Sequence, residues 1–456
     1  MFKYLNSALP VLLPLVFILA VEWRFLWILR RRGQSLNFFE LGVVYSGVVL
    51  IYSVFPGIEF LVGGLSFSVL GDYRLYRANP SPAEVGPIFW YYAVYLACFV
   101  VAYQIFRSPE PAEPPRVTGT SRKLLWVLVT VYACTYLFFA ALKAIWNLQT
   151  PDTYSDTYLL YSNLPPVVQF LANHMIGIAL LLQLGLMAYL VLDYAKYKRY
   201  IYLWLLVEFV GIAVFGVGSR TGLMVLLLAF AITYSTFVKR LSLRMVSSFG
   251  LVLLVLFVSL GIARAISSAV EDRDYSFFGS SNEFDALFAN AYDLDQLKAA
   301  GKVDEILPQI YFVDLTRMYP DQLFRSTHLD PSAWYVQNFY PEYANQGGGF
   351  AFGAIAESIV GLGWFDVLWR GLLVGWAFGA IQRMYVNGNH SYWSYAFYLW
   401  VIVFSYQTFR VTTLNLLPRA LGMLLLWWCG KFALNFFRAF QPNPTDLNST
   451  STAQGF

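Results

Sequence analysis

The stretch "IYLWLLVEFVGIAVFGVGSRTGLMVLLLAFAITYSTFV", residues 201–238, decides the class of this protein. It holds two apolar runs, 201–217 and 221–238. Each run is close to the roughly 20 residues that a helix needs to cross a bilayer. The charged residues in the stretch are Glu208 and Arg220. A charge at the centre of a membrane helix costs roughly 2.5–3.5 kcal/mol on insertion scales. We therefore expect Arg220 to lie in a turn at the membrane surface.

The composition of the whole chain points the same way. The 456 residues are 58% hydrophobic and 13% charged, with a formal net charge of +4. Soluble domains have about 25% charged residues, so we predict a polytopic membrane protein. The three cysteines fall in apolar runs without metal-ligand spacing. The sequence contains no nucleotide-binding loop, and we predict no metal, no cofactor and no nucleic-acid partner.

Apolar runs recur along the length of the chain, and we predict an all-α fold with about eleven spans, between ten and twelve. The spans lie near 8–28, 36–55, 87–106, 124–146, 166–192, 201–217, 221–238, 245–263, 366–385, 392–409 and 412–434. The run 8–28 is too long for a cleavable signal and is interpreted as the first span. The shorter run 58–70 is interpreted as interfacial because of its length and its Gly63-Gly64 pair.

Basic residues mark alternate connections, and these connections define the cytoplasmic side. They are Arg30, Arg31, Arg32, Arg107, Arg116, Arg122, Lys123, Lys196, Lys198, Arg199, Lys239, Arg240 and Arg244. The alternation places the N-terminus outside and the C-terminal tail inside.

The chain divides into four parts by composition. Spans one to eight occupy 1–263, and an acidic, aromatic-rich outer segment occupies 264–350, with a helix expected near 283–300. A Gly-rich interfacial helix and the last three spans occupy 351–435. The polar tail 436–456 is expected to be disordered.

Several arginines are predicted at the outer face, where the positive-inside bias should deplete them. They are Arg220, Arg264, Arg317, Arg325, Arg410 and Arg419. Arginine binds phosphate bidentately, and helix N-termini add backbone amides, so a pyrophosphate beside the membrane is the predicted ligand. Each arginine alone has another explanation. It could reach lipid phosphate, as interfacial arginines do, while Arg325 could pair with Asp321 and Arg419 could pack against a helix.

The Gly-rich stretch "NQGGGFAFGAIAESIVGLGW", residues 345–364, carries Glu357. It is apolar but short, so we expect a re-entrant or interfacial helix with Glu357 near the arginines. The alternative is a packing helix in which Glu357 only pairs with an arginine.

Four motifs in this order resemble the Wzy-type oligosaccharide repeat-unit polymerases, the O-antigen and enterobacterial common antigen polymerase family. They are "GSRTG", "PDQLFR", the Gly-rich stretch with Glu357, and "FRVTTLNLLPR", which together cover residues 200–420. The resemblance implies a GT-C-like glycosyltransferase of the bacterial inner membrane, with its active site facing the periplasm. Its partners would be an undecaprenyl-pyrophosphate-linked donor and acceptor, membrane lipid, and a chain-length regulator.

The family pattern extends to the arginines Arg220, Arg264, Arg325, Arg410 and Arg419, and Arg317 is added because it lies near them in sequence. Their charge would stabilise the departing pyrophosphate. Candidates for the base are Glu357, Asp285 and Glu283. Two other functions stay open. One is a ligase using lipid A core as acceptor, and the other is a lipid-linked oligosaccharide flippase. A flippase would need charges along a membrane path, whereas Glu22, Arg24, Lys143, Glu208, Asp366 and Arg370 are scattered in the sequence.

The orientation gives a first prediction, tested in a chain whose native cysteines are replaced. Cysteines introduced as Ser219→Cys and Ser280→Cys should react with a membrane-impermeant thiol reagent in spheroplasts, because both sites are predicted outside. Ser242→Cys lies in a basic loop and should react only after lysis. Labelling of the Ser242→Cys chain alone in intact spheroplasts would reverse the orientation.

Overall fold

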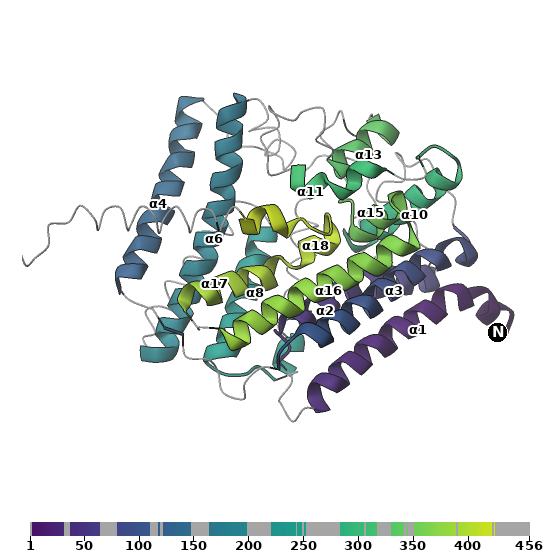
Figure 1. Ribbon diagram of the computed structural model, residues 1–456, viewed down its shortest axis with the longest axis horizontal. Helices are drawn as coiled ribbons and strands as arrows, with labels where there is room; N and C mark the ends of the chain where they lie inside the picture. Colours follow the sequence, from purple (N-terminus) through teal and green to yellow (C-terminus); the bar gives the residue numbers. More distant parts are fainter. Residues whose placement is uncertain are drawn as a thin grey trace, which may run out of the picture.

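The computed structural model describes most of the chain and is drawn in Figure 1. The described residues are 2–31, 37–63, 80–109, 117–118, 122–146, 164–197, 220–242, 244–248, 250–251, 283–304, 307–316, 330–341, 344, 351–388, 391–421 and 424. Within them the regular structure is helical, apart from one isolated bridge between Thr118 and Ser391. The helices are α1 (Phe2–Arg31), α2 (Leu41–Gly63), α3 (Pro82–Phe106), α4 (Arg122–Ile145), α6 (Pro166–Tyr197), α8 (Arg220–Phe237), α10 (Glu283–Ala299), η2 (Pro308–Tyr311), α11 (Val313–Thr316), α13 (Pro331–Phe339), α15 (Ala354–Val360), α16 (Trp364–Asn387), α17 (Tyr392–Phe404) and α18 (Tyr406–Arg410).

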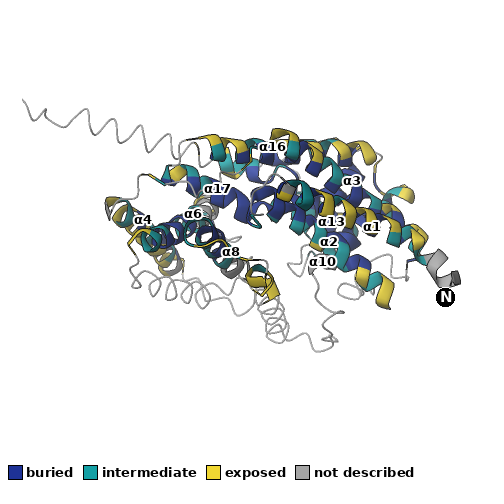
Figure 2. Ribbon diagram, turned by 90° about the horizontal axis from the view of Figure 1, so that it is seen from below, coloured by how far each residue is buried: buried dark blue, intermediate teal, exposed yellow. Residues whose placement is uncertain are grey.

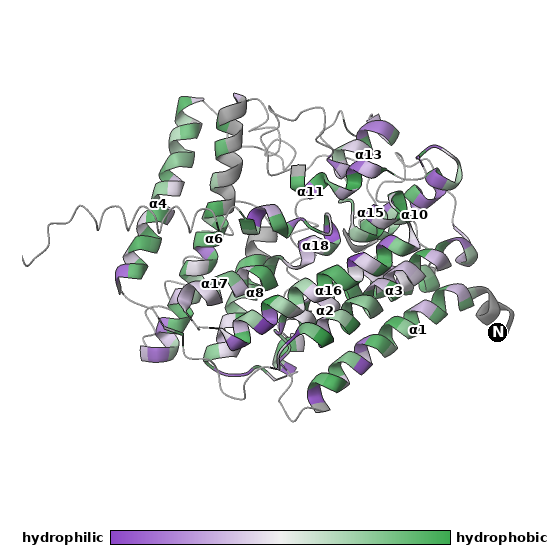
Figure 3. Ribbon diagram, viewed as in Figure 1, coloured by the Kyte–Doolittle hydropathy of each residue, from purple (hydrophilic) through white to green (hydrophobic). Residues whose placement is uncertain are grey.

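Six helices in the described residues are long and apolar enough to cross a membrane. They are Ala8–Arg30, Leu41–Val62, Pro82–Phe106, Lys123–Leu142, Ile178–Tyr197 and Trp364–Asn387. Figure 3 shows that most of the coloured residues along these helices are hydrophobic. Their exposed side chains include Trp23, Val62, Trp126 and Met384. Large exposed apolar side chains on helices of this length fit a lipid surface, so the prediction of an all-α membrane protein is confirmed at this level.

Some predicted spans differ from the helices observed. The span 392–409 is divided into α17 and α18 at Ser405, and the span expected from 412 does not begin there, because 411–415 are not helical. Helix α2 continues through Pro56 to Gly63, so the first residues of the run 58–70 belong to a span. The predicted spans 201–217 and most of 245–263, together with the tail 436–456, lie outside the described residues.

Helix α3 is the centre of the first group of spans, and 67% of its apolar window is buried. It packs against α1, α2 and α16, and Figure 1 shows α1, α3 and α16 running side by side. Three glycines of α16, each four residues apart, face the α3 backbone. A Cβ atom would lie 2.7 Å from the Tyr95 carbonyl oxygen at Gly371, 2.4 Å from that of Phe99 at Gly375, and 3.0 Å from that of Tyr103 at Gly379. This small-residue stripe is what lets the two backbones approach closely.

A second group consists of α4, α6, α8 and α17. Helix α17 joins it through two tyrosines. The Tyr392 hydroxyl donates to the Gly185 carbonyl oxygen at 2.6 Å, and the Tyr395 hydroxyl donates to Thr233 Oγ1 at 2.8 Å. Figure 2 shows buried residues concentrated where the helices meet and exposed residues on the outer sides of α1, α4 and α16.

The described part of the segment 264–350 packs on the first group. The helix predicted near 283–300 is present as α10, which contacts α2, α3 and α15. The Phe288 ring lies 4.5 Å from that of Phe89 in α3. Asp293, on the same helix, accepts hydrogen bonds from the hydroxyls of Tyr335 and Tyr340, which ties α10 to α13. The acidic, aromatic composition of this segment is therefore partly used to hold it together.

The close contact between α3 and α16 predicts that one methyl group added at Gly375 clearly lowers the stability of the folded chain. Gly375→Ala should lower the stability of the folded chain by about 1–3 kcal/mol, because the new Cβ overlaps the Phe99 carbonyl oxygen. Gly47→Ala is the matched control, since no atom lies within 4 Å of its added Cβ and alanine favours a helix. Thermal unfolding in detergent should show a lower midpoint for Gly375→Ala alone. An unchanged midpoint would contradict close packing at this position.

Candidate functional site

The site is built around the short helix α15, which glycines allow to fit between α10 and α16. Gly353 precedes α15 with φ of 91°, and Gly363 precedes α16 with φ of 61°. Other residues rarely adopt these left-handed values. At Gly361 a Cβ would lie 2.0 Å from Asp366 Oδ2, so a side chain does not fit. The Gly-rich stretch is thus explained by a tight connection between two helices, one of which carries Glu357.

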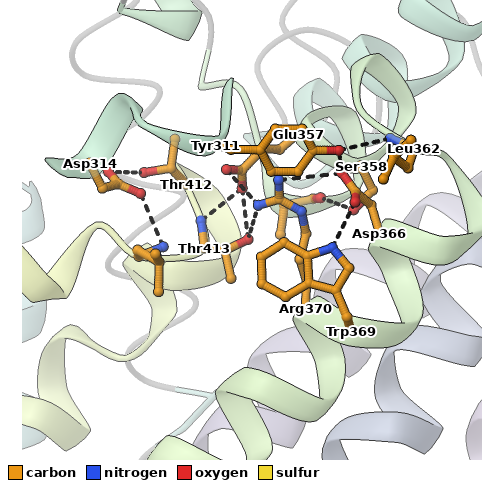
Figure 4. Close-up of polar contacts among 12 residues, drawn as sticks. Tyr311, Asp314, Glu357, Ser358, Leu362, Asp366, Trp369, Arg370, Thr412 and Thr413 are labelled. Atoms are coloured by element: carbon orange, nitrogen blue, oxygen red, sulfur yellow. Dashed lines mark hydrogen bonds and ion pairs between the residues drawn. The ribbon is translucent and has the colours of Figure 1, made fainter. Parts of the chain in front are cut away.

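Glu357 forms a buried ion pair with Arg370 of α16 (Figure 4). Arg370 Nη1 lies 2.6 Å from Glu357 Oε1, and Nη2 lies 3.4 Å from Asp366 Oδ2. The three side chains are 2%, 2% and 0% exposed, in the order Arg370, Glu357, Asp366. Breaking a buried pair of this kind leaves an uncompensated charge, so these residues depend on one another.

All four carboxylate oxygens of the cluster have hydrogen-bond or ion-pair partners. Glu357 Oε2 accepts from the Thr413 amide at 2.8 Å and from its Oγ1 at 2.7 Å. Asp366 Oδ1 accepts from Trp369 Nε1 at 2.7 Å, and Oδ2 accepts from the Tyr311 hydroxyl at 2.9 Å. Because burial and the bond to Asp366 raise the pKa of Tyr311 to about 12, its hydroxyl stays a donor at neutral pH.

The segment around Thr413 is also bound by a carboxylate from another element, Asp314 of α11. Asp314 Oδ1 accepts from Thr412 Oγ1 at 2.6 Å, and Oδ2 accepts from the Leu414 amide at 3.1 Å. Residues 411–415 are therefore fixed by Asp314 and Glu357 together, and we call this segment the clamped loop. The sequence predicted a helix here, because its leucines continue an apolar run. Carboxylates distant in sequence bind the amides and hydroxyls of the loop instead, which compensates for the missing helical bonds.

The clamped loop joins two of the predicted phosphate-binding arginines. Arg410 is the last residue of α18 and is partly buried, while Arg419 lies in the helical turn after the loop and is exposed. Arg419 Nη1 donates to Gln407 Oε1. Gln407 precedes Arg410 by three residues on α18, and residues so spaced are neighbours on a helix surface. The two guanidinium groups thus belong to one region of the structure.

The other predicted site residues are described less completely. Arg220 is the first residue of α8, Glu283 is the first of α10, and Asp285 lies in the first turn of α10, but only their backbone is described. Arg264, Arg317 and Arg325 lie outside the described residues. Glu357 has an arginine partner, as the alternative interpretation proposed, but this partner is Arg370 and not one of the six arginines predicted to bind phosphate.

Sequence reasoning did not bring Asp366, Arg370 and Asp314 into the site. Asp366 and Arg370 were counted among scattered intramembrane charges, whereas the structure places them together with Glu357. The available signal was their spacing, since opposite charges four residues apart in an apolar helix pair on one face. Asp314 carried no such signal, because its partners lie about one hundred residues away in the chain.

The charged side chains of this site are suited to holding neighbouring backbone segments in place. Lys298 of α10 donates to the carbonyl oxygens of Ile359 at 2.7 Å and Gly361 at 3.2 Å, which places a second positive charge at the end of α15. Within the described part of the chain, no group of three or more His, Cys, Asp or Glu side chains is placed to hold a metal ion. Both oxygens of Glu357 have partners, and its clear effect is to fix the clamped loop.

No family model matches this chain, and neither a curated protein nor a solved structure matches it.

Removing the charge of Arg370 should destabilise the protein. Arg370→Met leaves Glu357 and Asp366 buried without their cation, which costs about 3–5 kcal/mol, so the thermal midpoint should fall clearly. Arg383→Met, an exposed arginine of the same helix, is the control and should leave the midpoint unchanged. Adding Glu357→Gln to Arg370→Met should restore part of the loss, because one unpaired charge is gone. Equal thermal midpoints for Arg370→Met and Arg383→Met would mean that the ion pair does not stabilise the fold.

Proposed function

We propose that this protein is a membrane glycosyltransferase that polymerises lipid-pyrophosphate-linked oligosaccharide repeat units. The growing glycan would leave its undecaprenyl pyrophosphate and pass to a sugar hydroxyl of the incoming unit. In full, the proposal comprises about eleven spans in a GT-C-like arrangement, insertion in the bacterial inner membrane, and a site that faces the periplasm. A ligase that uses the same donor with another acceptor would share this site.

The single observation that carries the proposal is the clamped loop with its two arginines. Asp314 and Glu357 fix the loop; Arg410 directly precedes it, and Arg419, in the helical turn that follows it, donates to Gln407. Stabilising a departing pyrophosphate needs positive charge that is already in place, because groups that reorganise during the reaction contribute less. Arginine suits this task, since it stays charged and can bind two phosphate oxygens at once.

In this mechanism Glu357 and Asp314 are positioning residues. The oxygens of Glu357 are bound by Arg370 and by Thr413 of the clamped loop. The oxygens of Asp314 are bound by Thr412 and Leu414 of the same loop. The two carboxylates would act by holding Arg410 and Arg419 at a constant separation while the leaving group develops its charge. The predicted arginines Arg220, Arg264, Arg317 and Arg325 would add further contacts to the donor, and no step of the proposal requires a metal.

Transport of a lipid-linked oligosaccharide is the second candidate, and two observations favour it. Asp366 and Arg370 are buried charges within a span, and the α17–α18 break at Ser405 interrupts a predicted span. Both features occur in transporters, where they mark binding sites. The charges observed here are paired with one another, however, and this arrangement is at least as well explained by support of a fixed site.

The test is polymer formation by purified protein in vesicles supplied with a lipid-pyrophosphate-linked repeat unit. Arg410→Ala should slow transfer at least about tenfold, because a hydrogen bond to a charged group contributes about 1.5–3 kcal/mol. Arg410→Lys should recover only part of the rate, since the ammonium keeps the charge but loses the bidentate geometry.

Arg383→Ala, which removes an exposed arginine of α16 more than three turns beyond Arg370, is the control and should form polymer normally. All rates are compared per amount of folded protein. Translocation of the lipid-linked unit without any polymer would favour the transporter. Full activity of Arg410→Ala would remove Arg410 from the donor site.

A further inference from the structure

One carboxylate outside the cluster around Arg370 has no assigned role. Glu59 lies in the last two turns of α2, in the run 58–70 that the sequence indicated as interfacial. It follows Tyr45 and Tyr52 at intervals of seven residues, which is about two helical turns, so the three share one face of α2. The Tyr45 and Tyr95 hydroxyl oxygens are 2.6 Å apart, and the Tyr52 ring lies 5.9 Å from that of Phe409.

This face of α2 leads to the candidate donor site. Phe409 directly precedes Arg410, and Tyr52 contacts it from α2. Glu59 lies about two turns further along the same face. The face of α2 that carries Glu59 therefore also contacts the helix that ends at Arg410, through Tyr52 and Phe409.

The carboxylate of Glu59 is unusual in its hydrogen bonding. Both of its oxygens are buried and neither has a hydrogen-bond partner. Among the described residues, Glu22, Asp193 and Asp293 each leave one buried oxygen unbonded, whereas Glu59 leaves two. Burying polar groups without partners is costly, so such groups are rare in folded proteins and call for an explanation.

We propose that Glu59 is the general base for the acceptor hydroxyl. This inference rests on the proposed function. The hydroxyl oxygen forms a bond to the anomeric carbon of the donor sugar, and the bond from that carbon to the pyrophosphate oxygen breaks. The pyrophosphate takes the electron pair, and the hydroxyl proton passes to a Glu59 oxygen, which later releases it to water.

The contrast with Glu357 supports this assignment. Glu357 is bound by Arg370 and Thr413 through both oxygens, and so it has a positioning role. Neither oxygen of Glu59 is hydrogen-bonded, so a hydroxyl that reached this carboxylate would satisfy a buried acceptor.

The experiment compares Glu59→Gln with the wild-type full-length chain in vesicles containing the lipid-pyrophosphate-linked repeat unit. Glu59→Gln keeps the size of the side chain but cannot accept the proton, so kcat should fall at least about 100-fold. The KM for the donor should stay within about threefold, because the arginines are unchanged. Glu22→Gln is the matched control. Glu22 is a buried carboxylate of α1 that accepts from Ser46, and its replacement should leave kcat unchanged.

Three outcomes would overturn the inference. Polymer formation by Glu59→Gln at the wild-type rate would show that Glu59 takes no proton. A raised donor KM with an unchanged kcat would assign it to donor binding. A loss of folded protein matching the loss of rate, measured by thermal unfolding, would make its role structural. If the wild-type chain itself forms no polymer, the proposed function fails, and this inference fails with it.

Discussion

The ion pair between Arg370 and Glu357 is the interaction on which the rest of the structure depends. It joins α16, a span packed deep against α3, to α15, a short helix between glycines. Both side chains are almost wholly buried, so neither charge has water as an alternative partner. The pair is therefore stable only while Asp366 and Thr413 complete it, and this requirement fixes three separate parts of the chain at once.

The same cluster explains why the segment 264–350 is part of the fold and does not stand apart from it. Tyr311 donates to Asp366, Asp314 holds the clamped loop, and Lys298 binds the end of α15. Asp314 and Lys298 bind backbone groups that the clamped loop and the end of α15 leave without helical partners, and Tyr311 binds a buried carboxylate. The contacts that hold this segment in place are thus the contacts that complete the membrane helices.

Charged side chains divide into two kinds in this region. Glu357, Asp366 and Asp314 have their oxygens occupied, and their effect is to restrict the motion of neighbouring backbone. Arg410 directly precedes the clamped loop, and Arg419 lies in the helical turn that follows it. Such a division suits a site for a charged leaving group. The arginines would contact the charge, and the carboxylates would hold the backbone that carries the arginines in place.

The sequence by itself determined the all-α membrane class, since apolar runs of span length allow few other structures. It also singled out Glu357, because an acidic residue among glycines in an apolar stretch needs a partner. Only the tertiary structure decided that this partner is Arg370, that the spans near 392 and 412 are interrupted, and that α2 extends to Gly63. The reason is physical. Hydropathy reports whether a segment can lie in lipid. The clamped loop is set by Asp314 and Glu357, which lie 100 and 56 residues away in sequence, and no local pattern records such distant partners.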